Sequence, residues 1–278
     1  MMSEKSPLIQ ATRIGGHAYR YLTALPRRGR VVSSFSGGIN LLFKGGEAFV
    51  PVQSTNVPLH PWAIEIAGDA IHLAEETRAT TEDGKIRIEE VEIWLSDARI
   101  EELSLPRFST EEISVAQRNF PILSQFVEEA RKTHPPDPFQ EQIDAILHRW
   151  HESKDPAILL DMIGLGAGST PSGDDVLVGI IARMSLFEGV DDQAREALTQ
   201  LRSSIQKTAR ARTSLPSAQM LLCACERSFP EPILALLKSL TSEDASEDDL
   251  VEKADRVFQL GHHSGLAMLL GMKAEFVP

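Results

Sequence analysis

The sequence predicts an α+β protein. An N-terminal antiparallel β-rich domain, residues 1–108, precedes a C-terminal α-helical domain with buried apolar helices, residues 109–278. In the first part, β-branched residues alternate with polar ones between glycine-containing turns, a pattern typical of strands. In the second part, apolar residues recur at helical spacing between breaker segments. Hydrophobic residues make up 42% of the chain and charged residues 24%, so the composition excludes a largely disordered protein.

The expected strands come from alternation and from turn residues between the runs. The segment Lys44–Glu47, with two adjacent glycines, predicts a turn between two strands. The strand segments expected on this basis are Arg30–Leu42, Ala48–Val52, Trp62–Ile66 and Lys85–Trp94.

The expected helices follow the proline-rich breaker His134–Pro138. Phe139, Ile143, Ile146 and Trp150 then fall on one helical face. Residues 176–187 form a nearly all-apolar run that predicts a buried helix. Further helices are expected over residues 194–205, 214–228, 232–240 and 246–260.

Charge and patterning also exclude several classes of partner. The formal net charge of −12 argues against nucleic acid or an anionic membrane as a partner, because both require clustered Lys and Arg. No apolar run approaches the roughly 20 residues of a membrane span, and the N-terminus does not resemble a signal peptide. Cys223 and Cys225 are expected to be core thiols. We therefore expect a cytoplasmic protein.

The most informative segment is Gly164–Asp175, which reads Gly-Leu-Gly-Ala-Gly-Ser-Thr-Pro-Ser-Gly-Asp-Asp. Its glycines allow sharp turns and close approach of a ligand, and it leads into the N-terminus of a predicted helix. It does not match the nucleotide-binding loops. Asp174 stands where a phosphate-binding loop needs Lys, and Ser169 stands where the dinucleotide pattern needs a third glycine.

A second segment repeats part of this pattern. Ser172-Gly173 followed by Gly179 corresponds to Ser264-Gly265 followed by Gly271, with apolar residues between. One interpretation is coincidence, because Ser caps helices and small residues allow close helix packing. The other is that two helix N-termini point at one cavity and create a positive field for a carboxylate or phosphate.

Two adjacent carboxylates, Asp174 and Asp175, end the loop. They interact favourably with a helix dipole, which is one explanation. They repel a bare anion, so a functional role requires Mg²⁺, a basic side chain or a substrate that donates hydrogen bonds. A carbamoyl or amide compound with a carboxylate meets the last condition: its NH₂ donates to Asp, and backbone N–H groups with Thr170 or Ser172 bind its anionic end.

Other polar groups complete the candidate set. His262 and His263 suit acid–base catalysis but also helix capping. Arg212 suits a carboxylate or phosphate, or else a surface ion pair. Asn40 suits either a binding role or loop hydrogen bonding. The catalytic candidates are Asp174, Asp175, His262 and His263. The substrate-binding candidates are Gly166, Gly168, Ser169, Thr170, Ser172, Gly173, Arg212, Thr213, Ser264 and Asn40. The cofactor is unknown, with Mg²⁺ a candidate.

The Gly164–Asp175 loop, the buried helix after it and the late Gly261–Gly265 turn resemble a bacterial family long described as a domain of unknown function. The segments Ser34–Asn40 and Thr213–Ser217 are also similar to that family. It includes the AllH-type subunit of catabolic oxamate carbamoyltransferase. The resemblance implies carbamoyl exchange between oxalurate and phosphate, giving oxamate and carbamoyl phosphate, in purine (allantoin) nitrogen catabolism. It also implies other subunits as partners, and it assigns no catalytic residue.

We therefore expect an enzyme, or a subunit of a carbamoyltransferase complex, that binds a small carboxylate-containing carbamoyl or amide compound. A second hypothesis is a non-catalytic assembly or regulatory subunit whose glycine loop serves packing. A third is a metal-dependent phosphotransferase.

Overall fold

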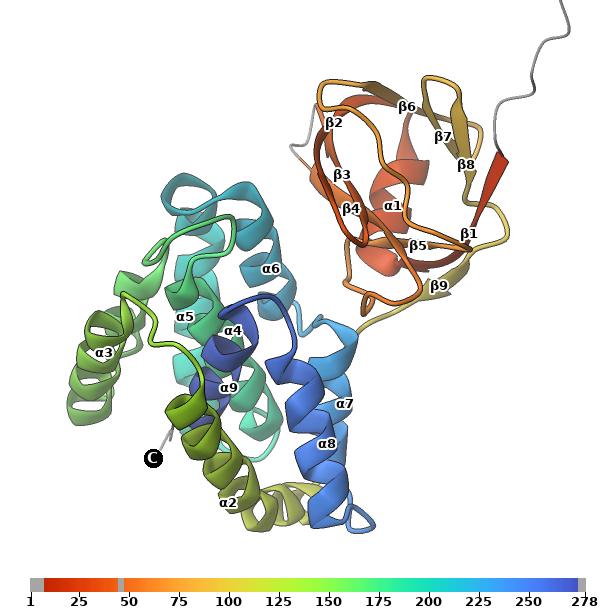
Figure 1. Ribbon diagram of the computed structural model, residues 1–278. Helices are drawn as coiled ribbons and strands as arrows, with labels where there is room; N and C mark the ends of the chain where they lie inside the picture. The colour runs from red at the N-terminus through yellow and green to blue at the C-terminus, as the bar shows by residue number, and fades with distance from the viewer. Residues whose placement is uncertain (1–7, 45–47, 275–278) are drawn as a thin grey trace, which may run out of the picture. The chain divides into compact units, whose positions relative to one another are not determined.

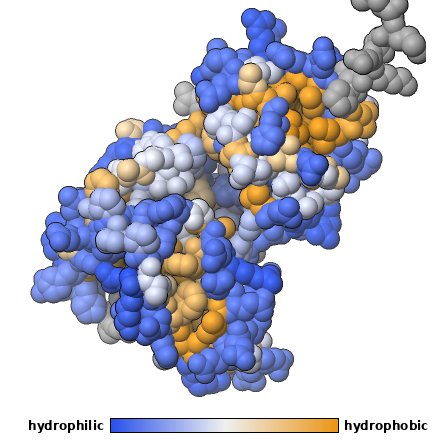
Figure 2. Space-filling model, in the orientation of Figure 1, coloured by the Kyte–Doolittle hydropathy of each residue, from blue (hydrophilic) through white to orange (hydrophobic). Residues whose placement is uncertain are grey.

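The computed structural model describes residues 8–44 and 48–274. The chain divides into two compact units, an N-terminal unit that ends at Leu103 and a C-terminal unit that begins at Ser104. The predicted fold class is confirmed, because the first unit is a β-barrel and the second is helical (Figure 1). Part of the predicted turn Lys44–Glu47 lies outside the described residues. Both units present mainly hydrophilic side chains, interrupted by apolar patches, on the face in Figure 2.

The N-terminal unit is a mixed barrel with one helix. In the described part of the chain, nine strands form one sheet in the order β5-β4-β3-β2-β6-β7-β8-β1-β9, and a β5–β1 pairing closes eight of them into a ring. Its elements are β1 (Leu8–Gly15), α1 (Gly16–Ala24), β2 (Arg27–Phe35), β3 (Gly38–Phe43), β4 (Ala48–Ser54), β5 (Ile64–Ile66), β6 (Arg78–Glu82), β7 (Lys85–Ile88), β8 (Val91–Trp94) and β9 (Arg99–Glu101).

Strand pairing in the barrel is mixed rather than purely antiparallel. The hairpins are antiparallel, as tight turns require. In contrast, β1 runs parallel to β8 and β9, and β4 runs parallel to β5. These parallel partners are joined by longer connections, which leave room for the chain to reverse its direction.

Two predicted strands are hairpins in the structure. The segment Arg30–Leu42 turns at Ser36-Gly37, and Lys85–Trp94 turns at Glu89, whose φ is 49°. Gly38 follows the first turn with φ of 153°, and a Cβ there would lie 2.0 Å from the Val52 carbonyl oxygen. Alternation alone does not reveal such a two-residue turn, because the alternation of apolar and polar residues resumes in the second strand directly after the turn.

Inward-facing apolar side chains fill the barrel. Ile39 and Leu41 of β3 stand opposite Val52 and Val50 of β4, and all four are fully buried. Helix α1 adds Ala18 and Leu22 to this core. Such pairs of branched side chains on one face of neighbouring strands stabilise the sheet.

The C-terminal unit surrounds two buried helices, α4 and α9. The predicted helices are all present, but the helix expected over residues 194–205 extends to Arg212, and a long helix over residues 110–133 is an addition to them. Cys223 and Cys225 are both buried, and burial raises the pKa of Cys225 to about 12. The elements are α2 (Thr110–Thr133), α3 (Gln140–Ser153), the 3-10 helix η1 (Pro156–Met162), α4 (Ser172–Phe187), α5 (Asp192–Arg212), α6 (Leu215–Cys225), α7 (Glu231–Leu240), α8 (Glu247–Phe258) and α9 (Ser264–Lys273).

Glycines allow α4 and α9 to pack backbone against backbone. A Cβ on Gly179 would lie 2.0 Å from the Met268 carbonyl oxygen, and a Cβ on Gly271 would lie 2.0 Å from that of Val176. The repeated Ser-Gly pattern thus has a packing role. Among residues 8–44 and 48–274, no helix combines the length and apolar character that a membrane crossing needs.

Candidate functional site

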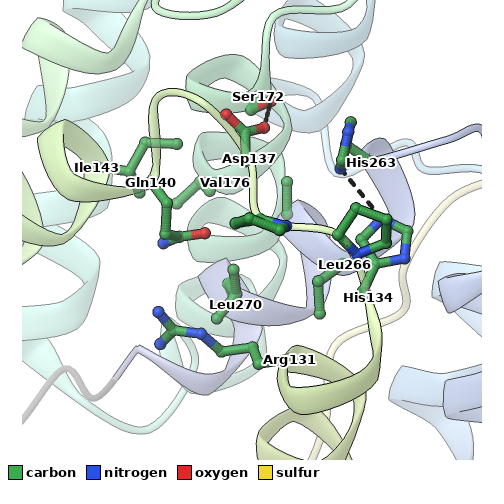
Figure 3. Close-up of a pocket in the computed structure, with 13 residues that line it drawn as sticks. Arg131, His134, Asp137, Gln140, Ile143, Ser172, Val176, His263, Leu266 and Leu270 are labelled. Atoms are coloured by element: carbon green, nitrogen blue, oxygen red, sulfur yellow. Dashed lines mark hydrogen bonds between the residues drawn. The ribbon is translucent and has the colours of Figure 1, made fainter.

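The candidate site is a cavity of about 120 Å³ in the helical unit. It lies between the α2–α3 connection and the N-terminal halves of α4 and α9 (Figure 3). Asp137 and Ser172 lie at one end, Arg131 at the other, and His263 with His134 at one side. Apolar side chains of α4 and α9 complete the wall. The space suits a small polar molecule rather than a nucleotide.

The two helix N-termini of the repeated pattern do meet. The hydroxyl groups of Thr170, before α4, and Ser264, at the start of α9, form a hydrogen bond of 3.1 Å. The N–H of Gly173 already donates to the Leu165 carbonyl, and the N–H of Asp174 to that of Pro171. The anion-binding hypothesis required these two N–H groups to be available to a ligand. Both are already hydrogen-bonded within the loop, which weakens that hypothesis.

The loop before α4 is held by its own backbone geometry. Gly164 has φ of 80°, and a Cβ there would lie 2.2 Å from the Arg212 carbonyl oxygen. Gly166 and Gly168 also have positive φ values, 136° and 85°. The carbonyl of Ser169 accepts a hydrogen bond from the Ser214 hydroxyl. These contacts tie the loop to the start of α6.

Asp174 is buried and saturated with hydrogen bonds. It accepts from the Gly164 N–H at 2.9 Å, from the Ser217 hydroxyl at 2.7 Å and from the Thr213 hydroxyl. Burial raises its pKa, and these donors with the charge of Arg212 oppose the rise. Arg212 is exposed at the end of α5. Asp174 does not line the cavity, and its position makes it a positioning residue for the loop.

Asp175 has the opposite surroundings. Its side chain is 1% exposed, and neither carboxyl oxygen has a hydrogen-bond partner. Burial raises its pKa to about 8, and the charges of Asp174 and Asp137 add to the rise. The Ser264 hydroxyl opposes this shift by its proximity, although it does not reach hydrogen-bond geometry with either oxygen. The carboxyl group is therefore mostly protonated at pH 7.

Asp137 and Ser172 form a hydrogen-bonded pair that faces the cavity. The Ser172 hydroxyl donates to one oxygen of Asp137, and the Phe139 N–H donates to the other at 2.7 Å. The sequence pattern indicates Ser172 as a site residue but presents the segment containing Asp137 only as a helix breaker. The local signal that could have identified it is an Asp between two prolines, placed so that it can accept from the backbone N–H two residues later.

Three histidines lie together beside the cavity. His134, the C-cap residue of α2, approaches His263 with 3.1 Å between its Nε2 and the His263 Nδ1. The His262 ring centroid lies 4.3 Å from that of His263. Burial and the neighbouring His262 lower the pKa of His263, and Asp137 opposes that shift. No sequence pattern indicates His134, because 129 residues separate it from His263.

The remaining candidates are placed as follows. Thr170, Ser172, Gly173, His262, His263 and Ser264 lie in the helical unit at or near the starts of α4 and α9. Thr213 contacts Asp174 rather than the cavity. Asn40 lies in the N-terminal unit on β3, where its amide donates to the Ser33 hydroxyl at 2.9 Å. That bond joins two neighbouring strands, so Asn40 lies in the sheet and not in the loop that the sequence suggested.

Comparison with known families matches both units. A model described as oxamate carbamoyltransferase subunit AllH matches residues 162–276, and a model of the AllH family N-terminal domain matches residues 10–100. The chain belongs to the AllH family. No curated protein and no solved structure matches it.

The AllH match covers only part of the cavity wall. It includes Ser172 on α4 and His263 before α9, but Asp137 and His134 lie between the two matched segments. The segment from α2 to α3 of this AllH-family chain thus adds a carboxylate, an imidazole and the Arg131 guanidinium to a site whose remaining walls, on α4 and α9, lie in the matched region.

Proposed function

We propose that this AllH-family chain is a subunit of an oxamate carbamoyltransferase-type enzyme and that its cavity binds a small carbamoyl or amide carboxylate. Other subunits of the complex would be its partners. A role in allantoin nitrogen catabolism and a cytoplasmic location are part of the same proposal.

The observation that carries this proposal is the separation of opposite polar groups across one small cavity. Arg131 supplies a guanidinium at one end, where Asp144 also pairs with it at 3.1 Å. Asp137 and Ser172 supply acceptor oxygens at the other end. A carboxylate suits the guanidinium fork, and a carbamoyl NH₂ suits the acceptors. Oxamate and oxalurate carry both groups.

The carboxylates of the loop contribute differently from Asp137. Asp174 positions the loop through Gly164, Thr213 and Ser217. Asp175 is neutral near pH 7, so it does not repel an anionic substrate. The acid–base role of His262 and His263 and a Mg²⁺ ion at the carboxylates stay predictions.

Calorimetry with oxamate, oxalurate and carbamoyl phosphate tests this function, using the chain alone and with its partner subunits. We expect Asp137→Asn and Ser172→Ala to weaken binding. Ser203→Ala is the matched control, because Ser203 is exposed on α5 and does not line the cavity. If none of these compounds binds to the chain alone or to the chain with its partner subunits, the proposal is contradicted.

The packing of the loop and of α4 against α9 supports a second candidate, a non-catalytic assembly or regulatory subunit. Gly164, Gly179 and Gly271 all fill positions where a side chain would collide with backbone. In that case Asp137→Asn would leave turnover of the reconstituted complex unchanged, whereas disruption of the loop by Asp174→Ala would abolish assembly.

A further inference from the structure

The histidine cluster, His134, His262 and His263, has the composition of a metal site. Its three side chains each offer a nitrogen, and these atoms all lie within 4.8 Å of one another. Neutral imidazoles are common ligands for zinc-type ions, and three of them with one open position are a recurrent zinc arrangement. Among residues 8–44 and 48–274, this is the one group of at least three His, Cys, Asp or Glu side chains whose ligand atoms lie close enough together to share an ion.

The distance between two of the nitrogens fits shared coordination. Two nitrogens bound at about 2.0–2.1 Å in tetrahedral geometry lie about 3.3 Å apart. His134 Nε2 and His263 Nδ1 are 3.1 Å apart, close to that separation, so a metal can replace their hydrogen bond once the rings rotate to direct both lone pairs at the ion. His262 is exposed, and its ring can adjust to complete the set.

The surroundings hold His134 in place. The His134 N–H donates to the Ala130 carbonyl at 3.0 Å and fixes the residue at the end of α2. The Phe258 ring packs edge-on against the His134 ring, with 5.4 Å between centroids. Such supporting contacts orient a ligand before the metal arrives.

We propose that His134, His262 and His263 bind one divalent transition-metal ion of the zinc type. Three nitrogen ligands favour such an ion over Mg²⁺, which requires oxygen ligands. His134 and His263 also line the cavity, so the open coordination position is available to a water molecule or to a polar atom in the cavity. This site does not depend on the proposed substrate.

Zinc binding by the full-length, untagged, metal-free chain tests the site. Isothermal titration calorimetry is expected to give one equivalent of Zn²⁺, and Co²⁺ in its place is expected to give a tetrahedral absorption spectrum. His134→Ala and His263→Ala should each weaken Zn²⁺ binding by at least about tenfold. Removing a residue that only supports a metal ligand already weakens binding by about tenfold or more, so removing a ligand should cost at least as much. His148→Ala is the matched control, because His148 is exposed on α3 and pairs with Glu152.

Thermal unfolding provides a second readout that needs no activity. Zn²⁺ should raise the unfolding temperature of the wild-type chain and of His148→Ala but not of the cluster variants, because an ion that binds only the folded state stabilises it. If His134→Ala does not fold, the exposed His262→Ala takes its place. Equal Zn²⁺ affinity in cluster and control variants, or no binding by the wild type, would overturn the proposal. Carbamoyl-compound binding without zinc binding would overturn this site and leave the proposed function intact.

Discussion

Asp174 and Asp175 are adjacent in the sequence and have opposite hydrogen-bonding environments. Asp174 accepts three hydrogen bonds, whereas Asp175 accepts none although it is as deeply buried. Successive residues of the first turn of α4 point in different directions, so one carboxyl group meets the start of α6 and the other meets the region of α9. The pair thus consists of one positioning carboxylate and one proton-bearing carboxyl group.

Replacing Asp174 should destabilise the helical unit. Asp174→Ala leaves the Ser217 hydroxyl and the Gly164 N–H without their acceptor. We expect a loss of about 2–4 kcal/mol in the free energy of unfolding, measured by urea denaturation. Asp161→Ala is the control, because Asp161 makes an exposed ion pair with Arg149 and should lose less than about 1 kcal/mol. An equal loss of unfolding free energy in Asp174→Ala and Asp161→Ala would contradict the positioning role of Asp174.

The protonation of Asp175 should appear in the pH dependence of stability. Its pKa is about 8 when folded and about 3.9 when unfolded. Between these values the folded state binds the additional proton, so stability falls as pH rises from about 4 to 8, by up to about 1.4 kcal/mol per unit. Asp175→Asn should remove this slope in denaturation at pH 5, 6, 7 and 8. Parallel curves for wild type and variant would show that Asp175 is ionised when folded.

Glycine at the α4–α9 contact should not tolerate a methyl group. Gly179→Ala places its Cβ 2.0 Å from the Met268 carbonyl oxygen, so the helices must separate. We expect a loss of about 1–3 kcal/mol, measured by thermal or urea unfolding. Gly189→Ala is the control, since the nearest atom to its added Cβ is 3.7 Å away. If Gly179→Ala leaves the free energy of unfolding unchanged, the two helices can move apart without cost and the close contact is not needed for stability.

Arg131 should contribute to the affinity for the anionic end of the ligand. Arg131→Gln removes the guanidinium from the cavity, and we expect roughly tenfold weaker binding of oxamate, corresponding to loss of one charged hydrogen-bonding group. Arg149→Gln is the comparison, because Arg149 is exposed and pairs with Asp161. Calorimetry on both variants makes the measurement, and equal affinities would place the carboxylate elsewhere.

Local patterns in the chain were sufficient to predict the division into a β-rich and a helical part, the positions of most helices and the Gly164–Asp175 loop. These features depend on periodicity and on turn residues, which a short window of sequence contains. The correspondence of Ser172-Gly173 with Ser264-Gly265 was also visible, and the contact between Thr170 and Ser264 gives it a spatial meaning.

Which groups meet could not be predicted in this way. Barrel closure depends on pairs between strands far apart in the chain, the antiparallel pair β1–β5 and the parallel pair β1–β8. The approach of His134 to His263 and of Asp137 to Ser172 depends on where α2 ends relative to α4 and α9. The protonation of Asp175 depends on burial and on neighbouring charges. Contacts between distant residues and the local dielectric environment are set by packing, and the order of residues along the chain does not encode them locally.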